Sequence, residues 1–169
     1  LILLNVYPLA YNVVLGFRDA SLTGADEGWT GGNNYGRIFR DDRFASAMRT
    51  TGLFVSAAVG LELLIGFAAA LALQKPFPGR GALVVALLIP MMLSQAVMGL
   101  YWNLVLNGHY GIVNLLLSGV GIAQPPQWLT DPDLKLASII LIDVWMWTPF
   151  MMLIAMAGLN AIPKHLYEA

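Results

Sequence analysis

Four long apolar runs are the feature of this sequence that most constrains its fold. They cover residues 1–17, 50–73, 82–106 and 137–159, and Glu62 and Asp143 are the only charged residues within them. At about 1.5 Å of rise per residue, each of the last three is longer as a helix than the roughly 30 Å hydrocarbon layer of a bilayer, whereas the first is marginal. Backbone amides in lipid must be bonded within their own segment, and these runs are too long for barrel strands. We therefore predict an all-α, polytopic membrane protein with four transmembrane helices.

Composition supports a membrane protein and argues against several other classes. Hydrophobic residues make up 58% of the 169 residues and charged residues 11%, whereas about a quarter of the residues in a soluble domain are charged. The net charge of -1 argues against a nucleic-acid partner. The chain has no cysteine, and its two histidines, His109 and His165, are too far apart to suggest a metal site. We expect neither a catalytic site nor a metal site in this chain.

Three polar segments connect the apolar runs. Residues 18–49 form a long segment of balanced charge, 74–81 a tight turn, and 107–135 a longer loop interrupted by a Pro-Pro pair. The second half of the first segment spaces four apolar residues as a helix lying on a membrane surface would: Tyr35, Ile38, Phe39 and Phe44. The chain begins inside an apolar run and stops as a new polar segment starts, so we expect a piece of a longer protein, truncated at both ends.

Seven short segments from Asn33 onward point to a known family. In chain order they are NNY..IFRDDRFASAM, K.F.GRG, LLIP, N..YGIVN, WLTDP, DVWMWTPFMMLI and GLNAIPKHLYEA. In this order they resemble the permease subunits of binding-protein-dependent ABC sugar importers of the maltose and glycerol-phosphate type. The resemblance covers about four fifths of the chain. It implies that residues 1–169 are a single transmembrane permease domain, a fragment of a larger domain of about six helices.

The resemblance implies a non-catalytic permease subunit that forms the pathway for a sugar or related polyol across the cytoplasmic (inner) membrane of a prokaryote. The implied partners are a second permease subunit, a dimer of ATP-binding cassette ATPases, an extracytoplasmic solute-binding protein, the sugar and membrane lipid. The chain has no G-x-x-x-x-G-K-[ST] phosphate loop, so we expect no cofactor in it, and ATP and Mg²⁺ are expected on the partner ATPase. The alternative is a stand-alone membrane carrier, or a membrane enzyme acting on sugar or lipid-linked sugar.

The tail of the chain favours the importer over a stand-alone carrier. In the family that the sequence resembles, LYEA opens the cytoplasmic EAA loop, a short helix that docks on the ATPase. This implies that residues 160–169 start the coupling helix, with Pro163 suited to its first position. The other implied coupling residues are Leu166, Tyr167, Glu168 and Ala169. The alternative is an ordinary interfacial helix at a membrane exit.

A cytoplasmic tail also implies the orientation of the chain. It places 74–81 inside, and 18–49, with its interfacial helix, and 107–135 outside. Counting Lys and Arg gives the opposite result, since six lie on the side of the two long loops and three on the other side. We follow the resemblance here, and expect 18–49 to be an extracytoplasmic loop.

Asp143 is the most informative charged residue in the apolar runs. A carboxylate at the centre of a lipid-facing helix costs roughly 2.5 to 3.5 kcal/mol on insertion scales, so Asp143 should face protein or a water-filled cavity. Met146, Trp147 and Phe150 share its helix face. Carboxylates accept hydrogen bonds from hydroxyls, and aromatic rings cover the apolar patches of sugars, so this face predicts a substrate-binding site. In the maltose-type permeases the matching positions contribute to the sugar site, with an amide-bearing residue in place of Asp143. The alternative is that Asp143 holds a neighbouring helix and the aromatic residues are packing.

Other polar residues in the apolar runs carry weaker predictions. Gln95, Tyr101, Trp102 and Asn103 are candidates for the pathway, in a helix that Pro90 is expected to bend. Tyr101, with Trp102, fits equally well as an interfacial anchor. Glu62 is expected to have a structural role, paired with an arginine or a backbone group of another helix.

Overall fold

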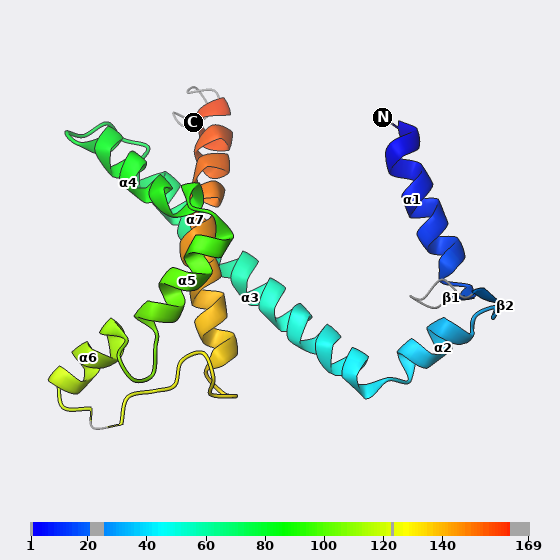
Figure 1. The fold of residues 1–169 in the computed structure, drawn as a ribbon. Coiled ribbons are helices and arrows are strands. Elements are labelled where there is room, and N and C mark those ends of the chain that lie inside the picture. Colours follow the sequence, from blue (N-terminus) through cyan, green and yellow to red (C-terminus); the bar gives the residue numbers. More distant parts are fainter. Residues whose placement is uncertain (1, 21–25, 123, 163–169) are drawn as a thin grey trace. The chain divides into compact units, whose positions relative to one another are not determined.

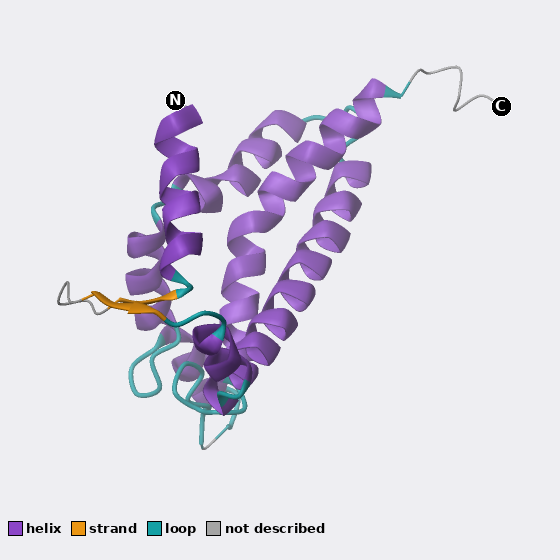
Figure 2. Ribbon diagram, turned by 90° about the vertical axis from the view of Figure 1, so that its right-hand side faces the viewer, coloured by secondary structure: helices purple, strands orange, loops and turns teal. Residues whose placement is uncertain are grey.

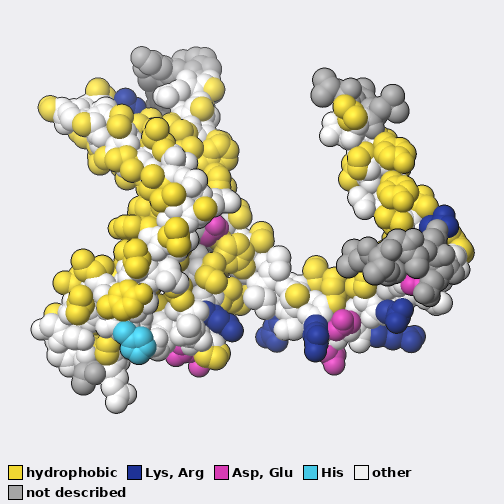
Figure 3. Space-filling view, in the orientation of Figure 1, with side chains coloured by type: hydrophobic (Ala, Val, Ile, Leu, Met, Phe, Trp, Pro, Cys, Tyr) yellow, Lys and Arg dark blue, Asp and Glu magenta, His cyan; other side chains and the backbone are white. Residues whose placement is uncertain are grey.

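The computed structural model describes residues 2–20, 26–122 and 124–162. Its elements in chain order are α1 (Ile2–Leu15), β1 (Arg18–Ala20), β2 (Asp26–Trp29), α2 (Asn33–Phe39), α3 (Asp42–Ala72), α4 (Arg80–Met92), α5 (Gln95–Val105), α6 (Ile112–Gly119) and α7 (Lys135–Ala161) (Figure 1). Apart from two short strands, the regular structure is helical (Figure 2). Hydrophobic side chains cover much of the helices, and charged side chains gather mainly near helix ends (Figure 3). The predicted helical membrane fold is confirmed, although the strands were not predicted.

Two helices are each long and apolar enough to cross a membrane. α3 has 31 residues and α7 has 27, which corresponds to about 46 Å and 40 Å at the helical rise. α3 begins at Asp42, earlier than the apolar run itself, because the Asp41 side chain accepts a 2.8 Å hydrogen bond from the backbone N–H of Arg43. Such a cap satisfies a backbone donor that the helix start leaves free. Three of the charged residues that the sequence analysis assigned to the loop, Asp42, Arg43 and Arg49, therefore lie in the spanning helix.

The third apolar run forms two separate helices, whereas we expected one helix with a bend. α4 and α5 are bent by 96° at the break between them, so they count as a third span only if the bent pair is taken together. Leu93 is extended, and the Ser94 hydroxyl accepts a 3.4 Å hydrogen bond from the N–H of Val97, which starts α5 afresh. Pro90 lies near the end of α4 and lacks an N–H. The predicted bend is confirmed, but it is a break between two helices.

α1 is apolar but has only 14 residues, about 21 Å of helix. It falls short of a full span within the part of the chain that the structure describes. The sequence predicted four transmembrane helices. Among the described residues, the structure has two helices long enough to span, one broken span and one short apolar helix.

The chain divides into two compact units, of which Leu1–Gly52 is the first. Its strands pair antiparallel, with Arg18 opposite Trp29. The Asn34 amide donates to the backbone oxygens of Gly16 and Arg18, at 3.1 Å and 2.9 Å, and so fixes α2 against the start of the hairpin. The Phe17 ring stacks on Trp29 with ring centres 5.5 Å apart. Two short strands alone are marginal in water, so these side-chain contacts hold the hairpin in place.

The predicted amphipathic helix is present but shorter than its sequence pattern. α2 carries Tyr35, Ile38 and Phe39, and the side chain of Phe39 is exposed. Phe44 lies in α3, and its ring contacts Phe39 edge-on at 6.3 Å. The pattern therefore continues across a helix boundary.

The second unit, Leu53–Ala169, holds the buried core. Ala70, Leu73 and Met152 form one cluster of buried residues in it. The half-buried side chains around this cluster come from α3, α4 and α7: Ala69, Val84, Leu88, Ala155, Met156 and Leu159. Gly66 permits the close approach of α3 and α7, because a Cβ atom placed on it would lie 2.8 Å from the Cβ of Met151. Small residues at helix crossings allow such contact in membrane proteins.

The loop between α5 and α7 is held by one buried side chain, Asn114 on α6. Its amide nitrogen donates to the backbone oxygens of Gly108 and Pro126, both at 3.0 Å, and its oxygen accepts a 2.7 Å hydrogen bond from the indole of Trp128. Asn107 shapes the start of the loop, since its side-chain oxygen accepts from the N–H groups of His109 and Tyr110. The segments N..YGIVN and WLTDP, which supported the resemblance, thus meet in one cluster of hydrogen bonds.

Candidate functional site: an acidic pair and an apolar pocket on opposite faces of one helix

Asp143 on α7 lies next to Glu62 on α3, so the two carboxyl groups form an acidic pair. Glu62 is only 4% exposed, whereas Asp143 is partly exposed. The partner expected for Glu62 was an arginine or a backbone group, so that expectation was wrong. The sequence had shown both residues as isolated charges in separate apolar runs, with nothing to indicate that they meet.

The helices that follow α3 carry few charged side chains in the described chain. α5 and α6 contain no charged residue, and the only one in α4 is Arg80, at its first position. The Arg80 side chain donates a 2.6 Å hydrogen bond to the backbone oxygen of Leu73 at the turn between α3 and α4. α7 has Lys135 at its first position and no charged residue between Asp143 and its end. The pair therefore lies in an apolar part of the bundle without a salt-bridge partner.

Only part of the predicted substrate face of α7 is accessible in the structure. The rings of Trp147 and Phe150 meet edge-on at 6.3 Å, and both side chains are accessible at least in part. Met146, in contrast, is buried. The face thus presents a carboxyl group beside two aromatic rings. Whether it binds a sugar stays a prediction.

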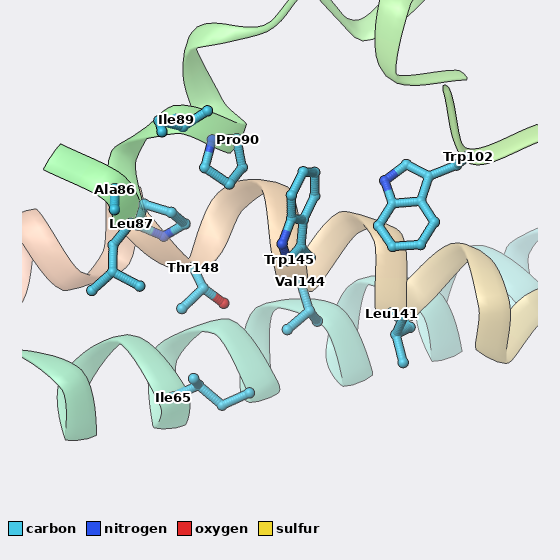
Figure 4. Close-up of a pocket in the computed structure, with 11 residues that line it drawn as sticks. Ile65, Ala86, Leu87, Ile89, Pro90, Trp102, Leu141, Val144, Trp145 and Thr148 are labelled. Atoms are coloured by element: carbon cyan, nitrogen blue, oxygen red, sulfur yellow. The ribbon is translucent and has the colours of Figure 1, made fainter. Parts of the chain in front are cut away.

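A pocket of about 580 Å³ opens on the other side of α7. With 3.6 residues per turn, Val144, Trp145 and Thr148 point away from the Asp143 face. The pocket is also lined by Ile65 of α3, by Trp102 of α5 and by residues of α4 (Figure 4). The sequence analysis had treated Trp102 as a pathway candidate or an interfacial anchor, and had not predicted this pocket.

The apolar wall of this pocket contains unsatisfied polar groups. The indole nitrogen of Trp102 and the hydroxyl oxygen of Thr148 are buried and have no hydrogen-bond partner among the described residues. Trp102 packs edge-on against Trp145, with ring centres 5.4 Å apart. Pro90 and Pro149 also line the pocket, and each lacks the N–H that would bond the backbone oxygen four residues earlier. Those two oxygens belong to Ala86 and Trp145, which line the pocket as well. Pro90 and Pro149, two of the three prolines within the apolar runs, were the sequence signal for this arrangement.

The other predicted pathway residues do not gather at one place. Gln95 is the first residue of α5 and is exposed. Tyr101 is exposed and touches Trp102 edge-on at 5.8 Å. Asn103 lines a smaller cavity of about 230 Å³ with the loop that follows α5. None of the three lines the pocket between α3, α4, α5 and α7.

The predicted ATPase-coupling residues lie outside the described residues. They are Pro163, Leu166, Tyr167, Glu168 and Ala169, and the described chain stops at Ile162. The coupling prediction therefore rests on the sequence resemblance.

The chain is similar to several permease proteins of ABC transporters, although no family model matches it. It is 36% identical over 164 residues to a probable ABC transporter permease, y4oQ, of Sinorhizobium fredii, covering 96% of this chain and 52% of that protein. It is 38% identical over 141 residues to the trehalose/maltose transport system permease MalF of Thermococcus litoralis, covering 83% of this chain and 48% of that protein.

A third relative is the sulfoquinovosyl glycerol transport system permease SmoG of Agrobacterium fabrum. The identity is 34% over 168 residues, which cover 99% of this chain and 54% of that protein. The chain therefore spans about half the length of the curated relatives it matches.

Solved structures show the same fold. The chain superposes with a TM-score of 0.84 on a bacterial ABC transporter involved in import of the acidic polysaccharide alginate, at 20% identity, covering 99% of this chain and 56% of that one. A second structure, in complex with an alginate pentasaccharide-bound periplasmic protein, gives a TM-score of 0.81 at 20% identity, covering 99% of this chain and 55% of that one.

Proposed function

This chain belongs to the permease subunits of ABC transporters, and we propose that its protein forms the membrane pathway of an importer for a sugar or related polyol. The observation that carries the proposal is the 38% identity over 141 residues to a trehalose/maltose permease. The pairing of a carboxyl group with two aromatic rings on α7 supports a sugar, because hydroxyls and C–H patches of a sugar fit those groups.

The proposal includes the partners that the sequence resemblance implies. A second permease subunit completes the pathway, and a dimer of ATP-binding cassette ATPases binds ATP and Mg²⁺ and supplies the energy. An extracytoplasmic solute-binding protein delivers the sugar, and the complex lies in the cytoplasmic (inner) membrane with residues 18–49 and 107–135 outside. The tail from Pro163 to Ala169 meets the ATPase. The apolar surface of α3 and α7 fits such an embedded subunit.

Reconstitution tests this function. The full-length protein is assembled with its partner permease, ATPase and binding protein in liposomes, and uptake of radiolabelled maltose, trehalose and maltotriose is measured with and without ATP. We expect ATP-dependent uptake of at least one of them. Uptake that persists without the ATPase would show a stand-alone carrier instead.

A charge reversal in the tail tests the coupling part separately. Glu168→Lys is expected to lower uptake and sugar-stimulated ATP hydrolysis while the complex still assembles, since a charge complementary to the ATPase is reversed. Lys135→Glu, a reversal at the start of α7 on the proposed outer side, is the matched control and should leave ATP hydrolysis near the wild-type rate. Normal coupling in Glu168→Lys would remove Glu168 from the interface.

A further inference from the structure

α6 exposes its apolar side and buries its polar side. Ile112, Leu115 and Leu116 are 57%, 61% and 68% exposed, and their spacing of three and four residues places them on one helix face. Asn114 lies on the other side of the helix and is 3% exposed. A surface helix of a water-soluble protein has the reverse arrangement, with the apolar side inward and the polar side outward. The outward face of α6 therefore suits an apolar environment and not water.

Hydrogen bonds fix α6 in this rotation. The Asn114 amide nitrogen donates to the backbone oxygens of Gly108 and Pro126, both at 3.0 Å, and its oxygen accepts a 2.7 Å hydrogen bond from Trp128. Turning the apolar face inward would break all three bonds and leave these polar groups without their partners. The inverted pattern is thus a property of the folded loop.

The loop around α6 has no charged side chain. Residues 107–130 contain no aspartate, glutamate, lysine or arginine, whereas residues 18–49 carry five arginines and five acidic residues. Val120 and Ile122, just after α6, are also exposed and extend the apolar surface. A contiguous apolar surface marks a contact with protein or membrane, and the rim of a contact with a soluble protein is polar. The lack of charge in 107–130 therefore favours lipid as the neighbour of α6.

The start of α7 indicates the depth of α6 in the bilayer. α7 is long and apolar enough to span a membrane, and Lys135 is its first residue, with Asp131 and Asp133 just before it. Charged residues are costly in the hydrocarbon layer, so the start of α7 lies near a membrane surface. Figure 1 shows α6 at the same end of the unit as the start of α7. Tyr110, an exposed residue just before α6, fits this level, where tyrosine is enriched.

The apolar surface of α6 is next to that of a membrane-crossing segment. α6 packs against α5, the second half of the broken span. Val97, Leu100 and Leu104 are exposed and recur on one face of α5. Both helices thus present apolar side chains to their surroundings, and lipid that covers α5 is adjacent to α6.

We propose that α6 is a membrane-surface helix, and that Ile112, Leu115 and Leu116 insert among the acyl chains at the boundary between headgroups and hydrocarbon. The other side of the helix is bonded to the loop through Asn114, so the loop between α5 and α7 is anchored to the bilayer. The inference depends on α7 spanning the membrane, and not on the solute that the protein transports. A second permease subunit and the solute-binding protein are the competing neighbours of this face.

Spin labels measure the surroundings of the apolar face directly. Leu116→Cys is made in the full-length protein, with any cysteine outside these 169 residues replaced, and carries a nitroxide in the complete complex in vesicles of phosphatidylethanolamine and phosphatidylglycerol. We expect frequent collision with oxygen, which concentrates in lipid, and rare collision with a water-soluble nickel chelate. Asp133→Cys, at an exposed position before α7, is the control, and its ratio of oxygen to nickel collision should be several times lower.

Either of two other results would overturn the proposal. Nickel access at position 116 equal to that at position 133 would put the face of α6 in water. Rare collision with both reagents would show that protein covers it. Ile112→Cys, on the same face, gives the same measurement if Leu116→Cys lowers the yield of the complex.

Photo-crosslinking identifies the neighbour itself. A benzophenone attached to Leu116→Cys should, on irradiation, join radiolabelled phosphatidylethanolamine of the vesicles to this chain. The labelled lipid recovered on the chain should be several times more than with benzophenone at Asp133→Cys. A larger product that contains the second permease or the binding protein, without labelled lipid, would refute the lipid contact.

Discussion

Trp128 donates a 2.7 Å hydrogen bond from its indole nitrogen to the side-chain oxygen of Asn114, and so joins α6 to the segment that leads into α7. Asn114 is 3% exposed and uses its amide for two more hydrogen bonds, to backbone oxygens on either side of the same loop. One buried side chain therefore determines the path of the loop between α5 and α7.

Asn114→Ala is expected to lower the stability of the complex by about 2–3 kcal/mol, because it leaves three buried or half-buried polar groups without a partner. The measurement is the melting temperature of the purified complex, together with proteolysis of the loop. Ser118→Ala, at an exposed position of the same helix, is the control. A melting temperature equal to that of the control would show that Asn114 does not hold the loop.

Gly66→Ala should destabilise the contact between α3 and α7, because the added Cβ would lie 2.8 Å from the Cβ of Met151 and 2.9 Å from the backbone nitrogen of Met152. We expect a loss of about 1–3 kcal/mol, typical of overpacking, measured as a lower melting temperature. Gly60→Ala is the matched control, since a Cβ there meets nothing within 4 Å and alanine favours the helix. Equal effects of both variants would contradict the close approach.

Thr148→Val should raise the melting temperature of the complex. The Thr148 hydroxyl is buried without a partner in the described structure, and valine has nearly the same shape without a polar group to desolvate, which is worth about 1 kcal/mol. Thr50→Val, at an exposed position of α3, is the control and should change little. A clear loss of stability in Thr148→Val would show instead that the hydroxyl has a partner in the assembled protein.

Single cysteines test the proposed orientation. The chain has no cysteine of its own, so Ser118→Cys on α6 and Gln74→Cys in the turn after α3 each give one label site, and both positions are exposed. An impermeant thiol reagent added to intact cells should label the first and not the second, and both after lysis. The reverse pattern would put the long loops inside, as the count of basic residues suggests.

Asp143→Asn should fold normally but alter the selectivity or apparent affinity of uptake, because a group that only accepts hydrogen bonds becomes one that donates and accepts. Trp147→Ala should also impair uptake, by removing a ring from the same face. Trp145→Ala, on the opposite face of α7, is the control for the second variant. If Asp143→Asn lowers only the yield of the complex, and the surviving protein keeps its selectivity, Asp143 is structural.

The sequence alone determined the properties that depend on local pattern. Uncharged runs longer than a bilayer is thick predicted helices, because lipid leaves the backbone no other partner, and α3 and α7 confirm this. The seven ordered segments indicated the permease family, which the relatives confirm. Pro90 indicated a bend, but the pattern could not distinguish a kink from the full break at Leu93 and Ser94. That break depends on the cap made by Ser94 and on the extended backbone at Leu93, and hydrophobicity along the run predicts neither of them.

Only the tertiary structure decided which side chains meet. The pairing of Glu62 with Asp143, the pocket between Trp102 and Thr148, and the hydrogen bonds of Asn114 all join residues from different elements. Helical periodicity specifies the face on which a residue lies, but not the neighbour that covers that face. The neighbour follows from the rotation and spacing of packed helices, which small residues such as Gly66 set through contacts far apart in the sequence. For this reason the sequence showed two isolated carboxyl groups, and the packed helices made them one pair.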